Sequence, residues 1–274
     1  MTVDLEIICV GNELLIGKVK DTNAHYLSKQ ATQLGANVKR VTVIQDTISE
    51  ISNTVCEAIA RKTKFIVITG GLGPTFDDKT LQGIAKALNR KLEVNSKALE
   101  MVKKNFFEYS KELQLSTEIE LTPPRVKMAT LPQNTEVVNN PVGTAPGVRV
   151  EVQGTILFAL PGVPLEMEAI FNETIAPVIK QAVGSNVFCE RSIFVDNTME
   201  SCLAPLIDKV MSDNEGVYVK SHPIRTENKP HLELHLTIVA HKEQKPAEKL
   251  AKAAKELISL VEAEGGSVIF ELEG

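Results

Sequence analysis

The first 183 residues alternate between short apolar runs and longer segments in which apolar positions recur every three or four residues. A short apolar run is typical of a buried strand, whereas the second spacing gives a helix one apolar face. The runs predict strands over residues 3–10, 37–44, 64–69, 147–152 and 155–160. The periodic segments predict helices over residues 22–34, 48–62, 77–88, 96–114 and 164–182. Strands that alternate with helices predict a three-layer α/β fold with a mostly parallel sheet.

The pattern changes near Gly184, after which two strands follow one another without an intervening helix. The predicted order is strand, helix, strand, strand, helix, strand, over residues 191–196, 199–212, 216–221, 231–241, 245–264 and 267–272. This βαββαβ order is typical of a small α+β domain. We therefore predict a larger α/β domain at residues 1–183 and a small α+β domain at residues 184–274. Residues 118–142, which include four prolines, are expected to be irregular.

The composition indicates a globular protein and argues against nucleic-acid and membrane partners. Hydrophobic residues make up 43% of the 274 residues and charged residues 24%, an ordinary balance for a globular protein. A net charge of −5 argues against a nucleic-acid partner, because such proteins concentrate positive charge, and it gives little attraction to a membrane surface. No apolar run is long enough to span a membrane, and the acidic N-terminus does not resemble a signal peptide. The four scattered cysteines lack metal-type spacing and indicate reduced thiols in a cytoplasmic protein.

The segment TGGLGPTFDDKT, residues 69–80, carries the strongest chemical signal in the chain. An apolar strand ends at Thr69, and three glycines then allow close backbone approach to a ligand before a helix begins near Asp77. Backbone N–H groups and a helix N-terminus at the carboxyl edge of a parallel sheet bind phosphates and mononucleotides. Asp77 and Asp78 would repel a phosphate there unless a divalent cation such as Mg²⁺ or Mn²⁺ bridges them.

A purely structural role for the same segment stays open. Thr75 and Asp78 have the spacing of a capping box, and Asp77 would interact favourably with the helix dipole. Two familiar phosphate motifs do not fit: Val19 stands where a P-loop needs Ser or Thr, and Phe76 stands where a dinucleotide fingerprint needs a small residue. The chain is therefore neither a Walker ATPase nor a typical dehydrogenase.

Polar residues also follow the first two strands, at the same predicted edge of the sheet. Asn12 and Glu13 come after the first strand, where Glu13 either accepts a hydrogen bond from a ribose or base or is simply a polar loop residue. Asp46 comes after the second strand, where its alternative role is to cap the next helix, together with Thr47.

Two later loops complete the set of candidates. NNPVGTAPG, residues 139–147, offers Gly143 and Thr144, and LPGVPLEME, residues 160–168, offers Gly162 and Glu166 in a strand–turn–helix setting. Ordinary turn and helix-end preferences explain the second of these loops almost as well.

The histidines do not predict a metal site. His231 and His235 share one face of a predicted strand, but four residues of strand separate them by roughly 13 Å, so one ion cannot bind both. A solvated strand face is the favoured interpretation.

Four ordered motifs, GNELLIGKVKDTNA, ITGGLGPTFDDKT, NNPVGTAPG and LPGVPLEM, together resemble the N-terminal part of the CinA (competence-damage-inducible) family. That part belongs to the wider molybdopterin-binding superfamily, and the resemblance covers roughly residues 4–182. Residues 186–272 resemble the small α+β domain that follows in CinA proteins. The C-terminal amidase domain of longer CinA proteins, which acts on nicotinamide mononucleotide, is expected to be absent here.

The resemblance implies metal-dependent cleavage of a nucleotide pyrophosphate such as ADP-ribose or an FAD-like dinucleotide, with Mg²⁺, Mn²⁺ or Co²⁺ as cofactor. It implies Asp78, Asp77 and Asp46 as catalytic candidates, the first two also as metal ligands. Lys79 is a candidate for neutralising phosphate charge. The candidate substrate-binding positions are Asn12, Glu13, Thr69, Gly70, Gly71, Gly73, Pro74, Thr75, Gly143, Thr144, Gly162 and Glu166. A homodimer is expected by the same analogy.

Two other functions stay open at this stage. One is a pterin-binding nucleotidyltransferase of molybdenum-cofactor synthesis, because that superfamily includes enzymes that transfer AMP to a pterin. The other is a protein that binds a nucleotide, or serves as an interaction module, without catalysis.

Overall fold

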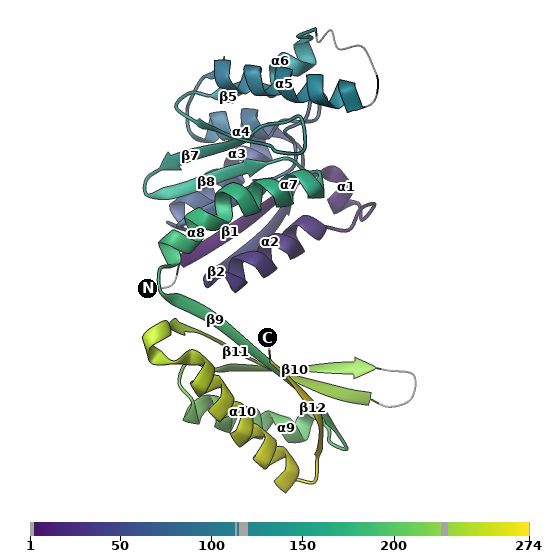
Figure 1. Ribbon diagram of the computed structural model, residues 1–274, viewed down its shortest axis with the longest axis vertical. Helices are drawn as coiled ribbons and strands as arrows, with labels where there is room; N and C mark the ends of the chain where they lie inside the picture. Colours follow the sequence, from purple (N-terminus) through teal and green to yellow (C-terminus); the bar gives the residue numbers. More distant parts are fainter. Residues whose placement is uncertain (1–2, 113, 115–119, 226–229, 274) are drawn as a thin grey trace. The chain divides into compact units, whose positions relative to one another are not determined.

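The computed structural model describes residues 3–112, 114, 120–225 and 230–273, which form two compact units (Figure 1). The first unit comprises the residues up to Thr32 together with Ala36–Val183. The second comprises Gln33–Gly35 and the residues from Gly184 onward. No helix in the described ranges is both long and apolar enough to cross a bilayer.

A six-stranded sheet forms the centre of the first unit, in the order β2-β1-β3-β8-β7-β6. Its strands are β1 (Val3–Val10), β2 (Ala36–Ile44), β3 (Phe65–Thr69), β6 (Glu136–Val138), β7 (Gly147–Val152) and β8 (Thr155–Leu160). Strands β2, β1, β3 and β8 run parallel, whereas β7 and β6 pair antiparallel with their neighbours. The mostly parallel α/β sheet predicted from the sequence is thus confirmed.

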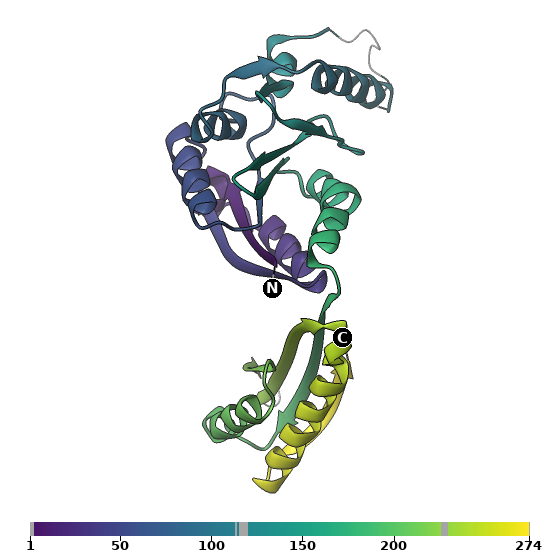
Figure 2. The same ribbon diagram turned by 90° about the vertical axis from the view of Figure 1, so that its left-hand side faces the viewer.

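Helices cover both faces of this sheet (Figure 2). On one face lie α3 (Ile48–Ala60) and α4 (Thr80–Ala87), and on the other lie α2 (Thr22–Gln33), α7 (Pro164–Ile170) and α8 (Ala176–Val183). All five residues of β3 are buried, as expected for a strand with helices on both sides.

Amphipathic spacing positions the helices on the sheet. Ile51 and Val55 of α3 and Ile84 of α4 belong to one apolar cluster with Ile66 and Ile68 of β3. Burying such side chains contributes roughly 1.5–3 kcal/mol each relative to exposure. The same face of the sheet also receives α5 (Ser96–Glu112), through Ala98 and Val102.

The proline-rich region is more regular than its sequence indicates. Among the described residues of 118–142, three short stretches are regular: α6 (Pro123–Met128), β5 (Thr130–Pro132), which pairs antiparallel with β4 (Leu92–Val94), and β6. The expectation of an irregular region was therefore wrong for these stretches and right for the described residues around them. Two consecutive prolines occupy the first turn of α6, where a missing N–H costs nothing and the fixed φ favours helix formation.

Two predicted helix boundaries also need correction. The helix expected from residue 77 begins at Thr80, because residues 75–78 form a side-chain-bonded turn that precedes it. The segment expected as one helix over 164–182 contains the π-helical turn η1 (Phe171–Ile175) between α7 and α8. Residue 113, which we placed in the helix 96–114, lies outside the described residues.

The second unit has the predicted βαββαβ order and a four-stranded antiparallel sheet in the order β10-β11-β9-β12. Its elements are β9 (Asn186–Asp196), α9 (Glu200–Asp213), β10 (Tyr218–Arg225), β11 (Pro230–His241), the 3₁₀ turn η2 (Lys242–Gln244), α10 (Pro246–Ala263) and β12 (Ser267–Glu273). Alternate residues of β11, Leu232, Leu234 and Leu236, pack with the helices.

The opposite face of β11 carries His231 and His235, each bonded to a carboxylate on the neighbouring strand β9. His231 bonds Asp196, and His235 Nε2 lies 3.1 Å from Glu190 Oε2. The two histidines are thus held by different carboxylates of β9 on a polar face of the strand.

Candidate functional site

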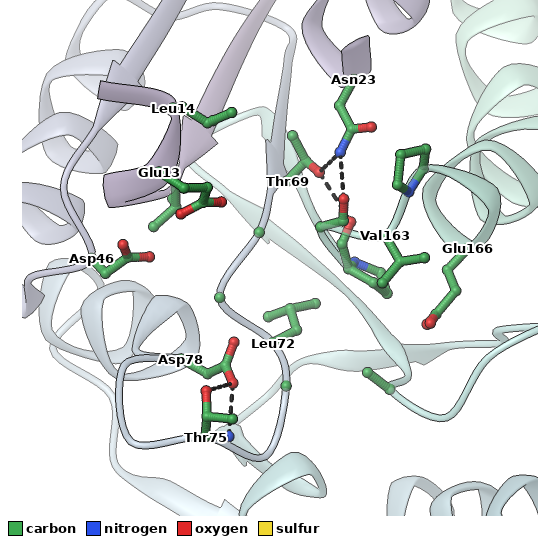
Figure 3. Close-up of a pocket in the computed structure, with 18 of the residues that line it drawn as sticks. Glu13, Leu14, Asn23, Asp46, Thr69, Leu72, Thr75, Asp78, Val163 and Glu166 are labelled. Atoms are coloured by element: carbon green, nitrogen blue, oxygen red, sulfur yellow. Dashed lines mark hydrogen bonds between the residues drawn. The ribbon is translucent and has the colours of Figure 1, made fainter. Parts of the chain in front are cut away.

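The parallel strands bring four loops to one edge of the six-stranded sheet. The segments after β1, β2, β3 and β8 all leave the sheet at its carboxyl edge, where α/β proteins bind ligands. A cavity of about 490 Å³, the main pocket, lies between these loops (Figure 3). Thirteen predicted candidates line it: Glu13, Asp46, Thr69, Gly70, Gly71, Gly73, Pro74, Thr75, Asp77, Asp78, Thr144, Gly162 and Glu166.

The glycine loop, Gly70–Gly73, starts with two positions that only glycine suits. Gly70 has φ of 102°, and a Cβ there would lie 2.2 Å from the carbonyl oxygen of Val10. Gly71 has φ of 68°, and a Cβ there would lie 2.4 Å from Thr80 Oγ1. The loop then returns to the sheet edge, since Thr80 donates to the carbonyl oxygen of Gly70 at 2.7 Å and, through its N–H, to that of Gly71 at 3.1 Å.

Three consecutive backbone N–H groups of this loop have no acceptor within the described part of the chain. They belong to Gly71, Leu72 and Gly73, all of which line the main pocket. Successive N–H groups in such a turn form a concave donor site for anions. The sequence predicted the loop from its glycines, but it does not show which N–H groups stay free.

The carboxylates of Asp77 and Asp78 are tied to Thr75. Asp78 Oδ2 accepts from the N–H of Thr75 at 2.8 Å and from its hydroxyl at 2.6 Å, and the same hydroxyl also contacts Asp77. The Thr75 hydroxyl holds the pKa of Asp77 below its ordinary value, with Lys127 and Lys79 acting in the same direction. The Thr75–Asp78 bond belongs to the turn and not to the helix start, because the residue that precedes α4 is Lys79, whose side chain forms no cap.

Lys127 of α6 joins this loop from a distant part of the sequence. Its Nζ donates to the carbonyl oxygen of Gly73 at 3.2 Å and also to that of Thr75. Burial lowers the pKa of Lys127, while the nearby carboxylates of Asp78 and Asp77 oppose that shift. Lys127 thus fixes the glycine loop and places a positive charge beside the two carboxylates.

Asp46 forms a hydrogen bond with the loop that follows β1. Its Oδ2 accepts from the backbone N–H of Asn12 at 2.6 Å. Burial raises the pKa of Asp46, the Asn12 bond opposes this, and the carboxylates of Glu13 and Asp77 raise it further. The alternative role of helix cap falls to Thr47, whose Oγ1 accepts from the N–H of Glu50. Asn12 itself does not line the pocket but positions Asp46.

Asn23 ties two of the loops together beneath the pocket. Its Nδ2 donates to Thr69 Oγ1 at 3.0 Å and to the carbonyl oxygen of Gly162 at 2.9 Å, and the Thr69 hydroxyl donates to Pro161. Asn23 is buried at the start of α2, in the KDTNA segment of the first motif. Sequence reasoning missed its role, although its place in that motif is a signal that would have found it.

Glu166 lies on the wall opposite Glu13 and Asp46 (Figure 3). Its Oε2 accepts from Asn140 Nδ2 at 2.6 Å. Burial raises the pKa of Glu166, and the hydrogen bond from Asn140 only partly offsets that effect. Gly143 does not line the pocket, but a Cβ at this position would lie 2.0 Å from the Glu166 carboxyl carbon, so Gly143 makes room for that side chain.

The pocket is strongly acidic. Lys20 is the one basic residue among its lining residues in the described chain, against six acidic residues: Glu13, Asp21, Asp46, Asp77, Asp78 and Glu166. The predicted phosphate-neutralising Lys79 is not among the lining residues. Across the described ranges, no three His, Cys, Asp or Glu side chains lie close enough to hold a metal ion on their own.

Comparison with known proteins gives three findings. Residues 6–181 match the family model described as "Probable molybdopterin binding domain". Proteins of Aeropyrum pernix and Caldivirga maquilingensis are each 41% identical to this chain, over 96% and 92% of it and 95% of each relative. The crystal structure of "the protein CinA with unknown function" from Thermoplasma acidophilum is 37% identical and matches 66% of this chain and 98% of its own, with a TM-score of 0.56.

Proposed function

The chain belongs to the molybdopterin-binding domain family, and we propose that its main pocket binds a nucleotide pyrophosphate and hydrolyses it with a divalent cation. ADP-ribose or an FAD-like dinucleotide is the expected substrate. One observation carries the proposal: the N–H groups of Gly71, Leu72 and Gly73, which find no acceptor among the described residues, line the same cavity as six acidic side chains.

The free N–H groups support a phosphate at the glycine loop. They lie at the carboxyl edge of the sheet, where such loops hold phosphate oxygens in nucleotide-binding folds. A phosphate oxygen would supply the acceptor that the loop lacks. Lys127 supports this shape of the loop through its hydrogen bonds to the carbonyl oxygens of Gly73 and Thr75.

The acidic lining supports a cation beside that phosphate. Two like charges about 4 Å apart repel by several kcal/mol near a protein surface, so a pyrophosphate among these carboxylates needs a neutralising partner. Mg²⁺ is commonly held by one or two protein carboxylates and takes its other ligands from water and phosphate. Asp77 and Asp78 would hold the ion, and Asp78 Oδ1 accepts no hydrogen bond from any described residue.

Hydrolysis would then use the chain's own groups as follows. When bound, the cation neutralises phosphate oxygens and stabilises charge in the transition state. Asp46, held by the Asn12 N–H and with its pKa raised by burial, accepts the proton of the attacking water. The water oxygen bonds to one phosphorus, the bridging P–O bond breaks, and the bridging oxygen leaves with the other phosphate.

A CinA-like identity is the finer part of the proposal. The 37% identity to the Thermoplasma CinA structure supports it, as do the four motifs that line or support the pocket. Cytoplasmic location and a homodimer stay predictions, which fractionation and sedimentation would test.

The family description favours a second candidate, in which the same pocket binds molybdopterin. A nucleotidyltransferase of this kind would join AMP to the pterin and would also need a cation beside the glycine loop. ATP-dependent adenylylation of molybdopterin, with no hydrolysis of ADP-ribose, would replace the first candidate by the second.

The direct test is an assay of the purified protein with ADP-ribose, NAD, FAD and CoA, each with Mg²⁺, Mn²⁺ or Co²⁺. We expect turnover that stops with EDTA. Asp78→Asn keeps the shape and one acceptor oxygen of the side chain, and we expect it to lower kcat by about 100-fold or more. The melting temperature should change little, because Asp78 lies at the pocket surface.

Asp208→Asn, an exposed acid of the second unit, is the matched control and should leave kcat unchanged. Full activity of Asp78→Asn would refute the assigned role of that residue. Tight binding of ADP-ribose without turnover by the wild-type protein would refute hydrolysis and leave a nucleotide-binding protein.

A further inference from the structure

A second cavity, of about 450 Å³, lies against the glycine loop and is here called the side cavity. Gly71, Leu72, Gly73 and Asp78 line both the side cavity and the main pocket. The two cavities are therefore separated by a single stretch of chain. A ligand that binds at the loop has room on either side of it.

The side cavity differs chemically from the main pocket. Most of its other lining residues are apolar and come from four different segments: Leu81, Leu92, Leu121, Pro123 and Val126. Leu92 and Leu121 are more than one-third exposed, so part of the apolar lining of the side cavity is open to a ligand from solvent. An apolar cavity of several hundred Å³ with a few polar groups is typical of small-molecule sites.

Two of the polar side chains that line the side cavity, Lys127 and Thr130, already form hydrogen bonds within the protein. Lys127 Nζ bonds the loop carbonyl oxygens, and Thr130 Oγ1 donates to the carbonyl oxygen of Val126. Gln82 of α4 is half-buried and bonds none of the described residues. Its amide offers a donor beside an acceptor, the pattern with which Gln pairs to the amino and ring-nitrogen edge of adenine.

We propose that the side cavity holds the neutral nitrogen heterocycle of a ligand whose phosphates lie in the main pocket, with Gln82 bonded to the ring edge. This proposal rests on the proposed function, because it names the second half of the same substrate. Lys127, the cation that lines the side cavity, already bonds the carbonyl oxygens of Gly73 and Thr75, and a flat neutral ring gains from leaving water beside the leucines. The substrate class is then a dinucleotide-type pyrophosphate, with an adenine-like ring beyond the glycine loop.

Calorimetric titration of the whole protein in Mg²⁺ tests this with three probes: adenosine, ribose 5-phosphate and ADP-ribose. Leu92→Trp fills the side cavity from an exposed strand, and Gln82→Leu removes the amide at nearly constant volume. We expect each variant to weaken adenosine and ADP-ribose binding by about tenfold or more, and to leave ribose 5-phosphate within about twofold. Riboflavin in place of adenosine distinguishes a flavin-like ring from a purine.

Leu272→Trp, on an exposed strand position of the second unit, and Gln30→Leu are the matched controls, because neither residue lines the main pocket or the side cavity. Both should bind all probes as the wild-type protein does. Failure of wild-type protein to bind adenosine or riboflavin would overturn the proposal, as would equal weakening of ribose 5-phosphate by Leu92→Trp.

Hydrolysis assays of the same variants separate this proposal from the function itself. If Leu92→Trp hydrolyses ADP-ribose with an unchanged KM, the side-cavity assignment is wrong and the proposed hydrolase function is supported. Ring binding that is lost in Leu92→Trp, in a protein without any turnover, would support the assignment and overturn the hydrolase.

Discussion

At the amino ends of the parallel strands the buried Glu6 accepts hydrogen bonds from three donor groups, two of them on a charged side chain, whereas at their carboxyl ends the half-buried Glu166 accepts from a neutral one. Glu6 accepts from Arg61 Nε at 2.9 Å, from Arg61 Nη2 at 2.7 Å and from Thr63 Oγ1 at 2.7 Å. Glu166 accepts from the neutral amide of Asn140. Burial alone would raise the pKa of both carboxyls, but the bonds of Glu6 reverse the direction. One end of the sheet is built for stability, and the other leaves charge uncompensated where a ligand would bind.

The largest expected change in the free energy of unfolding comes from replacing a glycine at the carboxyl end of the sheet, Gly70, and we compare it with Gly154 at the amino end. Gly70→Ala at the carboxyl end places a Cβ 2.2 Å from the Val10 carbonyl oxygen, at a φ that alanine disfavours. We expect it to lower the free energy of unfolding by about 4 kcal/mol or more. Gly154→Ala, before β8, has a similar φ of 85° with open space around it, and should cost only about 1 kcal/mol.

Denaturant unfolding of both glycine variants measures the difference. Equal losses would mean that backbone strain alone, and not the close approach of the loop to β1, requires glycine at position 70.

Glu6→Gln tests the amino end. Removing the carboxylate leaves Arg61, whose side chain is about one-third exposed, with the weaker acidic partner Glu57 at 3.7 Å, so we expect a loss of about 1–2 kcal/mol at pH 7. The pKa of Glu6 is lowered below its ordinary value of 4.5 in the folded state. Its stabilisation is therefore complete above about pH 4.5 and is lost as the pH falls through the folded-state pKa.

Unfolding curves of wild type and Glu6→Gln between pH 3 and pH 7 should accordingly converge at the acidic end. A constant difference across that range would show that the charge of Glu6 plays no part.

Glu166→Gln should raise the free energy of unfolding, and the change should be the smallest of those predicted here. The pKa of Glu166 is raised above 4.5, so the ionised carboxylate opposes folding at neutral pH. We expect the variant to be more stable than wild type by up to about 1 kcal/mol at pH 7, a small value because the residue is only half-buried. The gain should fade as the pH drops through the folded-state pKa toward 4.5 and vanish below it.

Thermal melts of Glu166→Gln across the same pH range provide the measurement. A destabilised variant at pH 7 would contradict the view that this end of the sheet carries uncompensated charge.

The strand–helix order and most of the pocket lining could be predicted because both depend on local pattern. Apolar runs mark buried strands, parallel strands share one carboxyl edge, and the loops after them must therefore meet. Gly70 and Gly71 were recognisable since no other residue suits their backbone. The acids of that edge, including Asp46 and Glu166, followed from the same geometry.

The remaining parts depend on contacts between distant residues. Lys127 reaches Gly73 across 54 residues of sequence, and Asn23 reaches Thr69 across 46. Neither residue type nor spacing indicates such a pair. The side cavity likewise requires α6, whose prolines we had taken as evidence against regular structure.

The π-helical turn η1 connects the packing of one helix to the direction of a pocket side chain. An α-helix advances about 100° per residue, and a π turn holds one residue more than an α turn, so η1 sets the angle between the faces of α7 and α8. Deleting a single exposed residue there, such as Asn172, would restore an α turn that makes the same rotation with one residue fewer, so Glu166 would still face the cavity. Deleting Glu168 within α7 would instead rotate the residues before it by about 100° and turn Glu166 away from the cavity, although no contact with ligand is removed.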